Sequence, residues 1–222
     1  MKYFSLTEIL VWSLSVIFIT ISFFVFDNEN YSILAVSLIG ATSLILNAKG
    51  NVAGQMLAVV FSIIYAIISF KSRYYGEMAT YLGMTAPIAV VSVITWLKNP
   101  FEDGKSEVKI NHLALKEYVF LGVLALAVTF GFYFILDFFN TSQIILSTVS
   151  VFTSFIAAYL TMRRSEYYAI GYSLNDIVLI MLWSIAGKPS MVICFSVFLI
   201  NDVYGFISWA GMKKRQSKRQ TL

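Results

Sequence analysis

The chain has 222 residues, of which 59% are hydrophobic and only 13% are charged, with a formal net charge of +4. Soluble domains carry about 25% charged residues, so this composition excludes an ordinary soluble protein and indicates an all-α integral membrane protein. The basic residues lie in short loops and in the C-terminal tail, which argues against a nucleic-acid partner.

Eight apolar segments approach the length of about 20 residues that a helix needs to cross a bilayer. They cover approximately residues 8–26, 31–47, 52–70, 76–97, 117–139, 142–161, 165–187 and 189–211. The first segment is too long for a signal peptide and has no small-residue cleavage site, so we expect residues 1–29 to be a retained, peripheral transmembrane helix.

The distribution of Lys and Arg predicts the orientation of these spans. An even number of spans places both termini on one side, and that side holds 13 of the 16 Lys and Arg residues, the others being Lys71, Arg73 and Lys188. By the positive-inside rule both termini are expected to be cytoplasmic, in a multi-pass protein of the cell membrane. The basic tail, residues 213–222, is expected to anchor this topology and to meet anionic lipid.

The first half of the chain offers few polar positions within its spans. Thr42, Ser43 and Gln55 are the interior candidates, although small hydroxyl residues in membrane helices often serve only packing. Pro87 removes a backbone hydrogen bond near the middle of its span and is expected to bend it, as a gate requires. Trp96 at the end of this span fits an interfacial position or a gate.

Two pairs of similar dipeptides suggest an internal repeat. Thr153-Ser154 follows Thr42-Ser43 by 111 residues, and Ser208-Trp209 follows Thr95-Trp96 by 113. We therefore expect parallel three-helix repeats at residues 30–98 and 141–212, joined by a cytoplasmic loop and a linker helix at residues 99–140. The first repeat has Ile88-Ala89 where the second has Asn201-Asp202, so polar chemistry is expected to concentrate in the second repeat.

The last two spans carry the most informative phrase of the sequence. Asn175-Asp176 and Asn201-Asp202 each interrupt an apolar run, and each Asp is followed seven residues later by a Trp, Trp183 or Trp209. Both carboxyl groups fall about 16 Å into their spans, near the bilayer centre. Ionisable groups at this depth are costly and are a functional-site hypothesis by default.

An aromatic stripe accompanies the first of these phrases. Tyr168, Tyr172, Asn175 and Trp183 recur at helical spacing on one span. Rings and carboxylates both attract positive charge, so the set favours a flat and cationic solute. The alternatives are that the Asn and Asp side chains only hydrogen-bond one another, with one Asp protonated, or that they form a proton or cation pathway.

Catalysis and metal binding have little support. The chain has one cysteine, Cys194, and one histidine, His112, which lies in a polar loop, and it has no His-Glu-x-x-His motif. We therefore expect no enzyme activity and no cofactor.

A set of ordered motifs resembles the Pnu family of vitamin transporters, in particular its nicotinamide riboside transporters. The similarity covers roughly residues 36–215 and rests on Leu46-Asn-Ala-Lys-Gly50, Tyr75-Gly-Glu77, Trp96-Leu-Lys-Asn-Pro100, Arg163-Arg-Ser-Glu166 and the two Asn-Asp phrases. The resemblance implies a three-plus-one-plus-three fold like that of the SWEET sugar transporters and a homotrimer. It also implies facilitated diffusion of the vitamin, followed by intracellular phosphorylation that traps it.

The family pattern Glu-x-Trp-x-x-Trp-x-x-x-Asn/Asp reads here as Glu166, Tyr168, Gly171 and Asn175, so its second Trp is absent. This departure leaves thiamine, riboflavin and deoxynucleosides as alternative substrates, but the pyridinium cation of nicotinamide riboside best suits a cage of acids and rings. The expected substrate-binding residues are Asn175, Asp176, Asn201, Asp202, Tyr168, Tyr172, Trp183 and Gln55. The expected gating or packing residues are Pro87, Glu77, Trp96, Trp209 and Thr42.

Overall fold

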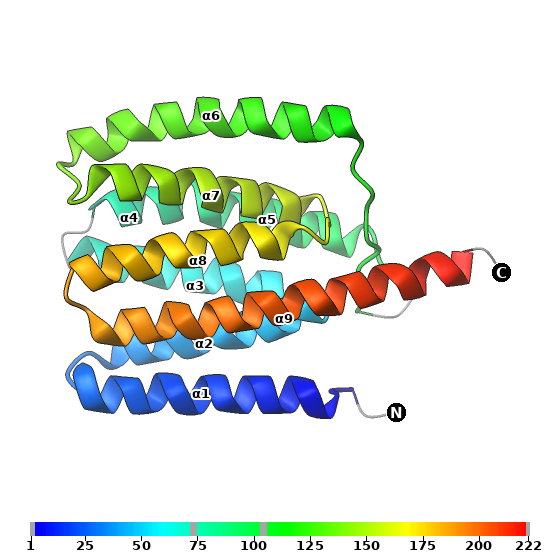
Figure 1. Cartoon of the computed structure of the whole chain (residues 1–222), viewed down its shortest axis with the longest axis horizontal. Helices are drawn as coiled ribbons and strands as arrows, with labels where there is room; N and C mark the ends of the chain where they lie inside the picture. Colours follow the sequence, from blue (N-terminus) through cyan, green and yellow to red (C-terminus); the bar gives the residue numbers. More distant parts are fainter. Residues whose placement is uncertain (1–2, 72–74, 103–105, 221–222) are drawn as a thin grey trace.

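Long apolar helices run side by side along almost the whole chain (Figure 1). A computed structural model describes residues 3–71, 75–102 and 106–220. Its helices are α1 (Leu6–Phe26), α2 (Tyr31–Ala48), α3 (Val52–Lys71), α4 (Tyr75–Thr80), the π-helical turn η1 (Tyr81–Thr85), α5 (Ala86–Leu97), α6 (Leu115–Phe138), α7 (Ile144–Met162), α8 (Tyr168–Ile185) and α9 (Pro189–Gln220).

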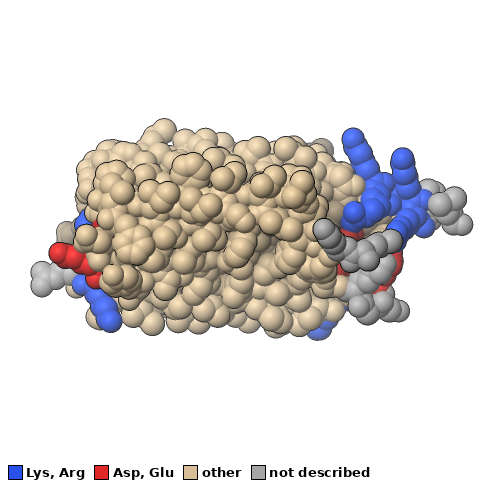
Figure 2. All heavy atoms as spheres, turned by 90° about the horizontal axis from the view of Figure 1, so that it is seen from below, with Lys and Arg blue, Asp and Glu red and all other residues tan. Residues whose placement is uncertain are grey.

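The prediction of eight spans is confirmed. Within the described residues, eight helices are long and apolar enough to cross a membrane, and α4, η1 and α5 together form the fourth. On the face drawn in Figure 2, acidic and basic side chains gather at the two ends of the molecule and leave the middle to other residues. This distribution matches a protein whose central belt contacts lipid.

Six of the spans form a closed ring. Following the contacts around the ring, α2 packs on α3, α3 on α5, α5 on α7, α7 on α8, α8 on α9, and α9 returns to α2. Helix α1 packs outside the ring against α9 and α2, as expected for a peripheral helix, and α6 packs outside it mainly against α7. The interior of the ring is therefore the place where a polar site can be kept from lipid.

Small residues bring α7 and α8 very close together. A Cβ atom at Gly171 would lie 2.9 Å from the Cα and the Cβ atoms of Ala157. Close backbone approach through small residues is the usual way in which membrane helices pack. A tryptophan, which the family pattern has at this position, has no room between these two backbones.

The fourth span is irregular where proline was expected to bend it. Pro87 lies in the first turn of α5, immediately after η1. Because proline donates no backbone hydrogen bond, the ladder upstream of it must be rearranged, and here a π-helical turn absorbs the change. The irregularity therefore covers residues 81–85, on the N-terminal side of the proline.

Helices α2 and α7 end in the same way. Each is followed by a residue with positive φ, Gly50 at 66° and Arg164 at 59°. In each turn the next amide N–H donates to the carbonyl five residues earlier, at 3.0 Å for Asn51 and 2.9 Å for Ser165. This is the Schellman arrangement, which satisfies the last carbonyls of a helix.

The loop after α5 is packed against the helix ends, although it was expected to be a simple linker. The Val108 amide donates to the Gly50 carbonyl at 3.0 Å. The buried side chain of Gln216 accepts from the Ile110 amide at 2.9 Å and donates to the Val108 carbonyl at 3.0 Å. The basic tail expected after residue 212 continues α9 as far as Gln220, and the loop braces this extension.

Candidate functional site

A cavity of about 110 Å³ lies inside the ring and is lined by residues of all six ring helices. Neither α1 nor α6 contributes a lining residue. The polar lining residues are Ser43, Asn47, Gln55, Ser62, Glu77, Thr80, Tyr81, Thr85, Ser92, Ser150, Ser154, Thr161, Tyr172, Asn175, Asp176 and Asp202. The ring thus encloses a polar chamber between apolar helices.

Two acidic side chains meet in this chamber. Asp176 on α8 and Asp202 on α9 are 4% and 3% exposed, and their carboxyl groups lie close enough to interact with each other. Two neighbouring carboxyl groups in a low-dielectric interior rarely both ionise, so we expect the pair to carry at most one negative charge. The Oδ2 atom of Asp176 has no hydrogen-bond partner in the described residues, and both side chains line the cavity.

Asn175 is held in place by α7. Its Oδ1 atom accepts hydrogen bonds from the hydroxyl groups of Ser150 and Thr153, each at 3.0 Å. Two donors on the same oxygen fix the orientation of the amide, because only the carbonyl oxygen can accept. Asn175 therefore presents a fixed polar group beside Asp176 in the wall of the cavity.

A second polar chain comes from α2 and α3. Gln55 donates to Asn47 Oδ1 at 2.9 Å, Asn47 donates to Ser43 at 3.4 Å, and Ser43 donates to the Gly54 carbonyl at 2.8 Å. All three side chains are buried and line the cavity. The expectation that polar chemistry concentrates in residues 141–212 is therefore wrong, because residues 30–98 line the chamber with comparable polar groups.

The fourth span adds an acidic side chain to the cavity wall, and aromatic rings complete the wall. Glu77 on α4 and Tyr81 on η1 both line the cavity, which makes Glu77 the third carboxyl group facing it. Tyr172, Phe61 and Phe198 supply ring surface from α8, α3 and α9. Acids and aromatic faces together form the kind of surface that holds an organic cation.

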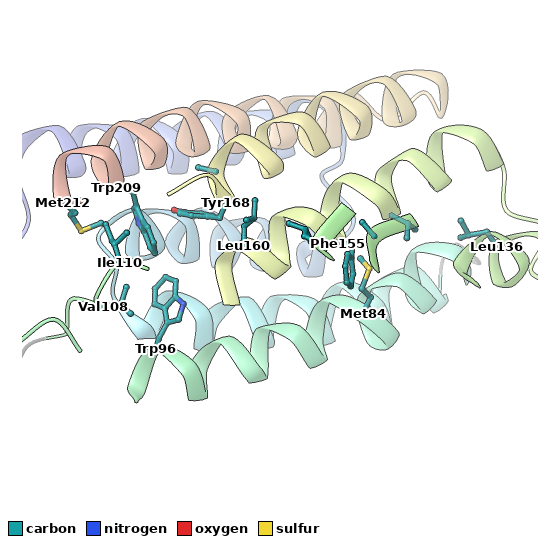
Figure 3. Packing of buried hydrophobic residues seen from close by; sticks show 14 residues of the cluster. Met84, Trp96, Val108, Ile110, Leu136, Phe155, Leu160, Tyr168, Trp209 and Met212 are labelled. Atoms are coloured by element: carbon teal, nitrogen blue, oxygen red, sulfur yellow. The ribbon is translucent and has the colours of Figure 1, made fainter. Parts of the chain in front are cut away.

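Three aromatic side chains close the ring at the end that carries the termini (Figure 3). Trp96 and Trp209 are 2% and 0% exposed, with ring centroids 5.5 Å apart, and Tyr168 packs edge-on against Trp209 at 4.8 Å. Burial of Trp96 shows that its interfacial assignment is wrong. Tyr168 does not line the cavity and lies one helical turn beyond Tyr172.

The two indoles make reciprocal hydrogen bonds. Trp96 on α5 donates to the Thr161 carbonyl of α7 at 2.9 Å, and Trp209 on α9 donates to the Asn47 carbonyl of α2 at 2.8 Å. Each bond therefore joins a helix of residues 30–98 to a helix of residues 141–212. The layer formed by Trp96, Trp209 and Tyr168, here called the aromatic floor, ties the two halves together below the cavity.

Several expected site residues lie away from the cavity. Asn201 donates to Ser15 of α1 at 2.8 Å, so it faces the peripheral helix while Asp202 faces the chamber. Thr42 accepts from the indole of Trp12 on α1 at 3.2 Å. Trp183 is buried at the end opposite the termini and lines a separate cavity there.

Sequence reasoning missed several lining residues. Among them are Asn47, which is polar, and Tyr81, which is aromatic. The signal for Asn47 was present, because it lies one turn after Ser43 on the same face of α2. Tyr81 had no comparable signal, since its direction depends on the π-helical turn in which it lies. Among the described residues, no group of three or more His, Cys, Asp and Glu side chains is placed to hold a metal ion.

Comparison with known proteins gives consistent results. Residues 30–211 match the model of a family described as nicotinamide mononucleotide transporter. A protein of Neisseria mucosa named nicotinamide riboside transporter PnuC is 26% identical over 93% of this chain and 82% of its own length. The protein of the same name from Haemophilus influenzae is also 26% identical, over 79% of this chain and 77% of its own length.

The fold agrees as well. A solved structure titled as the crystal structure of the vitamin B3 transporter PnuC superposes with a TM-score of 0.83, covering 97% of this chain and 95% of its own, at 21% sequence identity. Together with the eight apolar helices, these similarities identify a multi-pass membrane protein. The family match spans well over half of the chain, and the chain therefore belongs to the nicotinamide mononucleotide transporter family.

Proposed function

We propose that this chain carries nicotinamide riboside across the cell membrane by facilitated diffusion, and that phosphorylation inside the cell traps the vitamin. The names of the two relatives support this substrate. The observation that carries the proposal is the enclosed chamber, in which the Asp176 and Asp202 pair lies among aromatic rings. A pyridinium ring is flat and cationic, so it gains from both kinds of group.

The charge of the chamber favours the riboside over its phosphorylated form. Among the residues that line the cavity in the described part of the chain, three are acidic and none is Lys, Arg or His. A phosphate group would need cationic partners and would be repelled by the carboxyl groups. The same charge does not separate nicotinamide riboside from thiamine, which is also cationic, while a neutral deoxynucleoside would leave the acid pair without a charged partner.

The two halves of the ring support an arrangement of two parallel repeats. The equivalent ends of α2 and α7, and the reciprocal bonds of Trp96 and Trp209, follow each other at offsets of 113 to 114 residues. We propose that residues 30–98 and 141–212 move against each other around the chamber, as repeats do in alternating access. With the positive-inside bias, the aromatic floor is then the cytoplasmic gate.

The test is transport by the purified protein in liposomes. We expect labelled nicotinamide riboside to equilibrate across the membrane without ATP and without an ion gradient, and an inside-negative potential to increase its accumulation, because the substrate is a cation. Nicotinamide mononucleotide is the matched competitor and is expected not to inhibit. Absence of riboside movement, or inhibition by the mononucleotide at equal concentration, would refute the proposal. Acidification of the lumen in step with uptake would show that transport is coupled to protons and is not facilitated diffusion.

A further inference from the structure

A second cavity, of about 370 Å³, lies at the end of the molecule opposite the termini. It is formed where the turn between α1 and α2 meets the end of α3 and the turn between α8 and α9. We call it the outer cavity. It is separate from the central chamber, since the two share no lining residue.

The outer cavity has the same chemical character as the chamber. Asp27 and Glu29 supply two carboxylates, against one cation, Lys188. The side chain of Asp27 accepts a hydrogen bond from Ser190 at 3.4 Å, which ties the turn between α1 and α2 to the first turn of α9. The cavity therefore has an acidic excess at the mouth of the bundle and attracts cations.

Aromatic rings line its inner side. Trp183 and Tyr65 are 4% and 3% exposed, and both line the outer cavity. The faces of tryptophan and tyrosine attract organic cations, and desolvation strengthens this attraction. Carboxylates at the mouth and rings at the base give a flat cation a place for its charge and for its faces.

Tyr65 also forms the wall between the two cavities. Its ring stacks on Phe61, with centroids 5.6 Å apart and planes 17° apart, and lies 4.4 Å from the ring of Tyr81. Phe61 and Tyr81 line the central chamber on their other side. One layer of aromatic rings thus separates the outer cavity from the chamber, and a solute that passes through this layer leaves one site and enters the other.

We infer that the outer cavity is a first binding station for the cationic solute on its way to the chamber. This inference rests on the proposed function, but it adds a site with residues of its own. Asp27 and Glu29 lie in the turn that follows α1, so this station depends on that turn. Both residues precede residue 30, where the family match begins. The peripheral helix α1 then has a function in capturing the solute, although it does not line the chamber.

The experiment removes the two carboxylates with little change in shape. In the double variant Asp27→Asn, Glu29→Gln, we expect the initial rate of nicotinamide riboside uptake at low substrate, kcat/KM, to fall about fourfold, at roughly twofold per charge. The rate at saturating substrate is expected to stay the same, because the chamber is intact. The difference is expected to shrink at high salt, since these groups are at the surface.

The matched control is Asp137→Asn. Asp137 is an exposed acid near the end of α6, at the same end of the molecule, and it does not line the outer cavity. We expect its kcat/KM to equal that of the unchanged protein. An equal loss in both variants would show a general effect of surface charge and overturn the inference, as would an unchanged kcat/KM in the double variant.

A neutral substrate separates capture of charge from damage to the site. Uptake of the reduced, uncharged dihydronicotinamide riboside is expected to be equal in the double variant and the unchanged protein. A fourfold loss for this neutral substrate as well would overturn the inference. Failure of the proposed function can be distinguished from failure of this inference, because in that case the unchanged protein would move neither riboside.

Discussion

Replacing both members of the acid pair by their amides tests the role of charge in the chamber. In the double variant Asp176→Asn, Asp202→Asn each side chain keeps its size, and the two amides can hydrogen-bond to each other. An amide does not ionise, so the pair loses its negative charge. The structure predicts that this variant folds and binds the cationic riboside more weakly.

The expected loss follows from the geometry. A cation about 4 Å from a carboxylate gains about 4 kcal/mol at an effective dielectric constant of about 20. Asp176 and Asp202 are neighbours and rarely both ionise, so one negative charge is shared by the two side chains and only part of it lies next to the ligand. Halving the interaction energy of about 4 kcal/mol gives about 2 kcal/mol, which corresponds to a rise in Kd of about thirtyfold.

Calorimetric titration of the purified protein with nicotinamide riboside and with its neutral reduced form measures this effect. The cationic ligand is expected to lose about thirtyfold in affinity, whereas the neutral form is expected to change by less than threefold. Asn201→Ala is the matched control, because Asn201 lies next to Asp202 in the sequence but faces Ser15 of α1. Equal losses for the two ligands, or a thirtyfold loss in the control, would refute the assignment of charge recognition to the acid pair.

Three further outcomes follow from the structure. Gln55→Ala removes a polar group from the chamber wall and the donor that orients Asn47, which also lines the chamber, and is expected to weaken riboside binding about tenfold by titration. Gly171→Ala places a methyl group 2.9 Å from the α7 backbone and is expected to cost about 1–3 kcal/mol in thermal unfolding, whereas Gly122→Ala on α6, where a Cβ atom meets nothing within 4 Å, is expected to cost nothing. Trp209→Phe keeps a ring in the aromatic floor but loses one hydrogen bond, and is expected to lower stability by about 1 kcal/mol and to speed exchange of bound riboside.

The sequence was sufficient to predict the spans and the acid pair, for the same physical reason. Charged side chains are rare in membrane segments because they are costly there, so both the long apolar runs and the exceptions within them are conspicuous. Asp176 and Asp202 were found on this ground, and the structure places both of them at the chamber. The ring closure between α9 and α2 was not predicted, because it depends on contacts between distant parts of the chain.

The direction of individual side chains was harder to predict. Neighbouring residues on a helix point about 100° apart. Asn175 and Asp176 nevertheless both line the chamber, whereas Asn201 faces Ser15 and only Asp202 lines it, and the sequence alone did not distinguish these two cases. Asn47 escaped notice because a polar residue near the end of a span fits a helix terminus equally well. For Tyr81 the obstacle was the π-helical turn, which shifts the direction of the residues within it.

The reciprocal tryptophan bonds are suited to a gate because neither accepting carbonyl depends on them. The Asn47 carbonyl also accepts from the Gly50 amide at 2.8 Å, and the Thr161 carbonyl also accepts from the Arg164 amide at 3.0 Å. A carbonyl oxygen has two lone pairs, so when an indole leaves, the carbonyl keeps one partner and no backbone group is left unsatisfied. When the freed indole N–H reaches water in the open state, each bond costs only the net value of about 1 kcal/mol to break, because neither its donor nor its acceptor is left unpaired. The aromatic floor can therefore hold the two halves together at rest and still release them within a transport cycle.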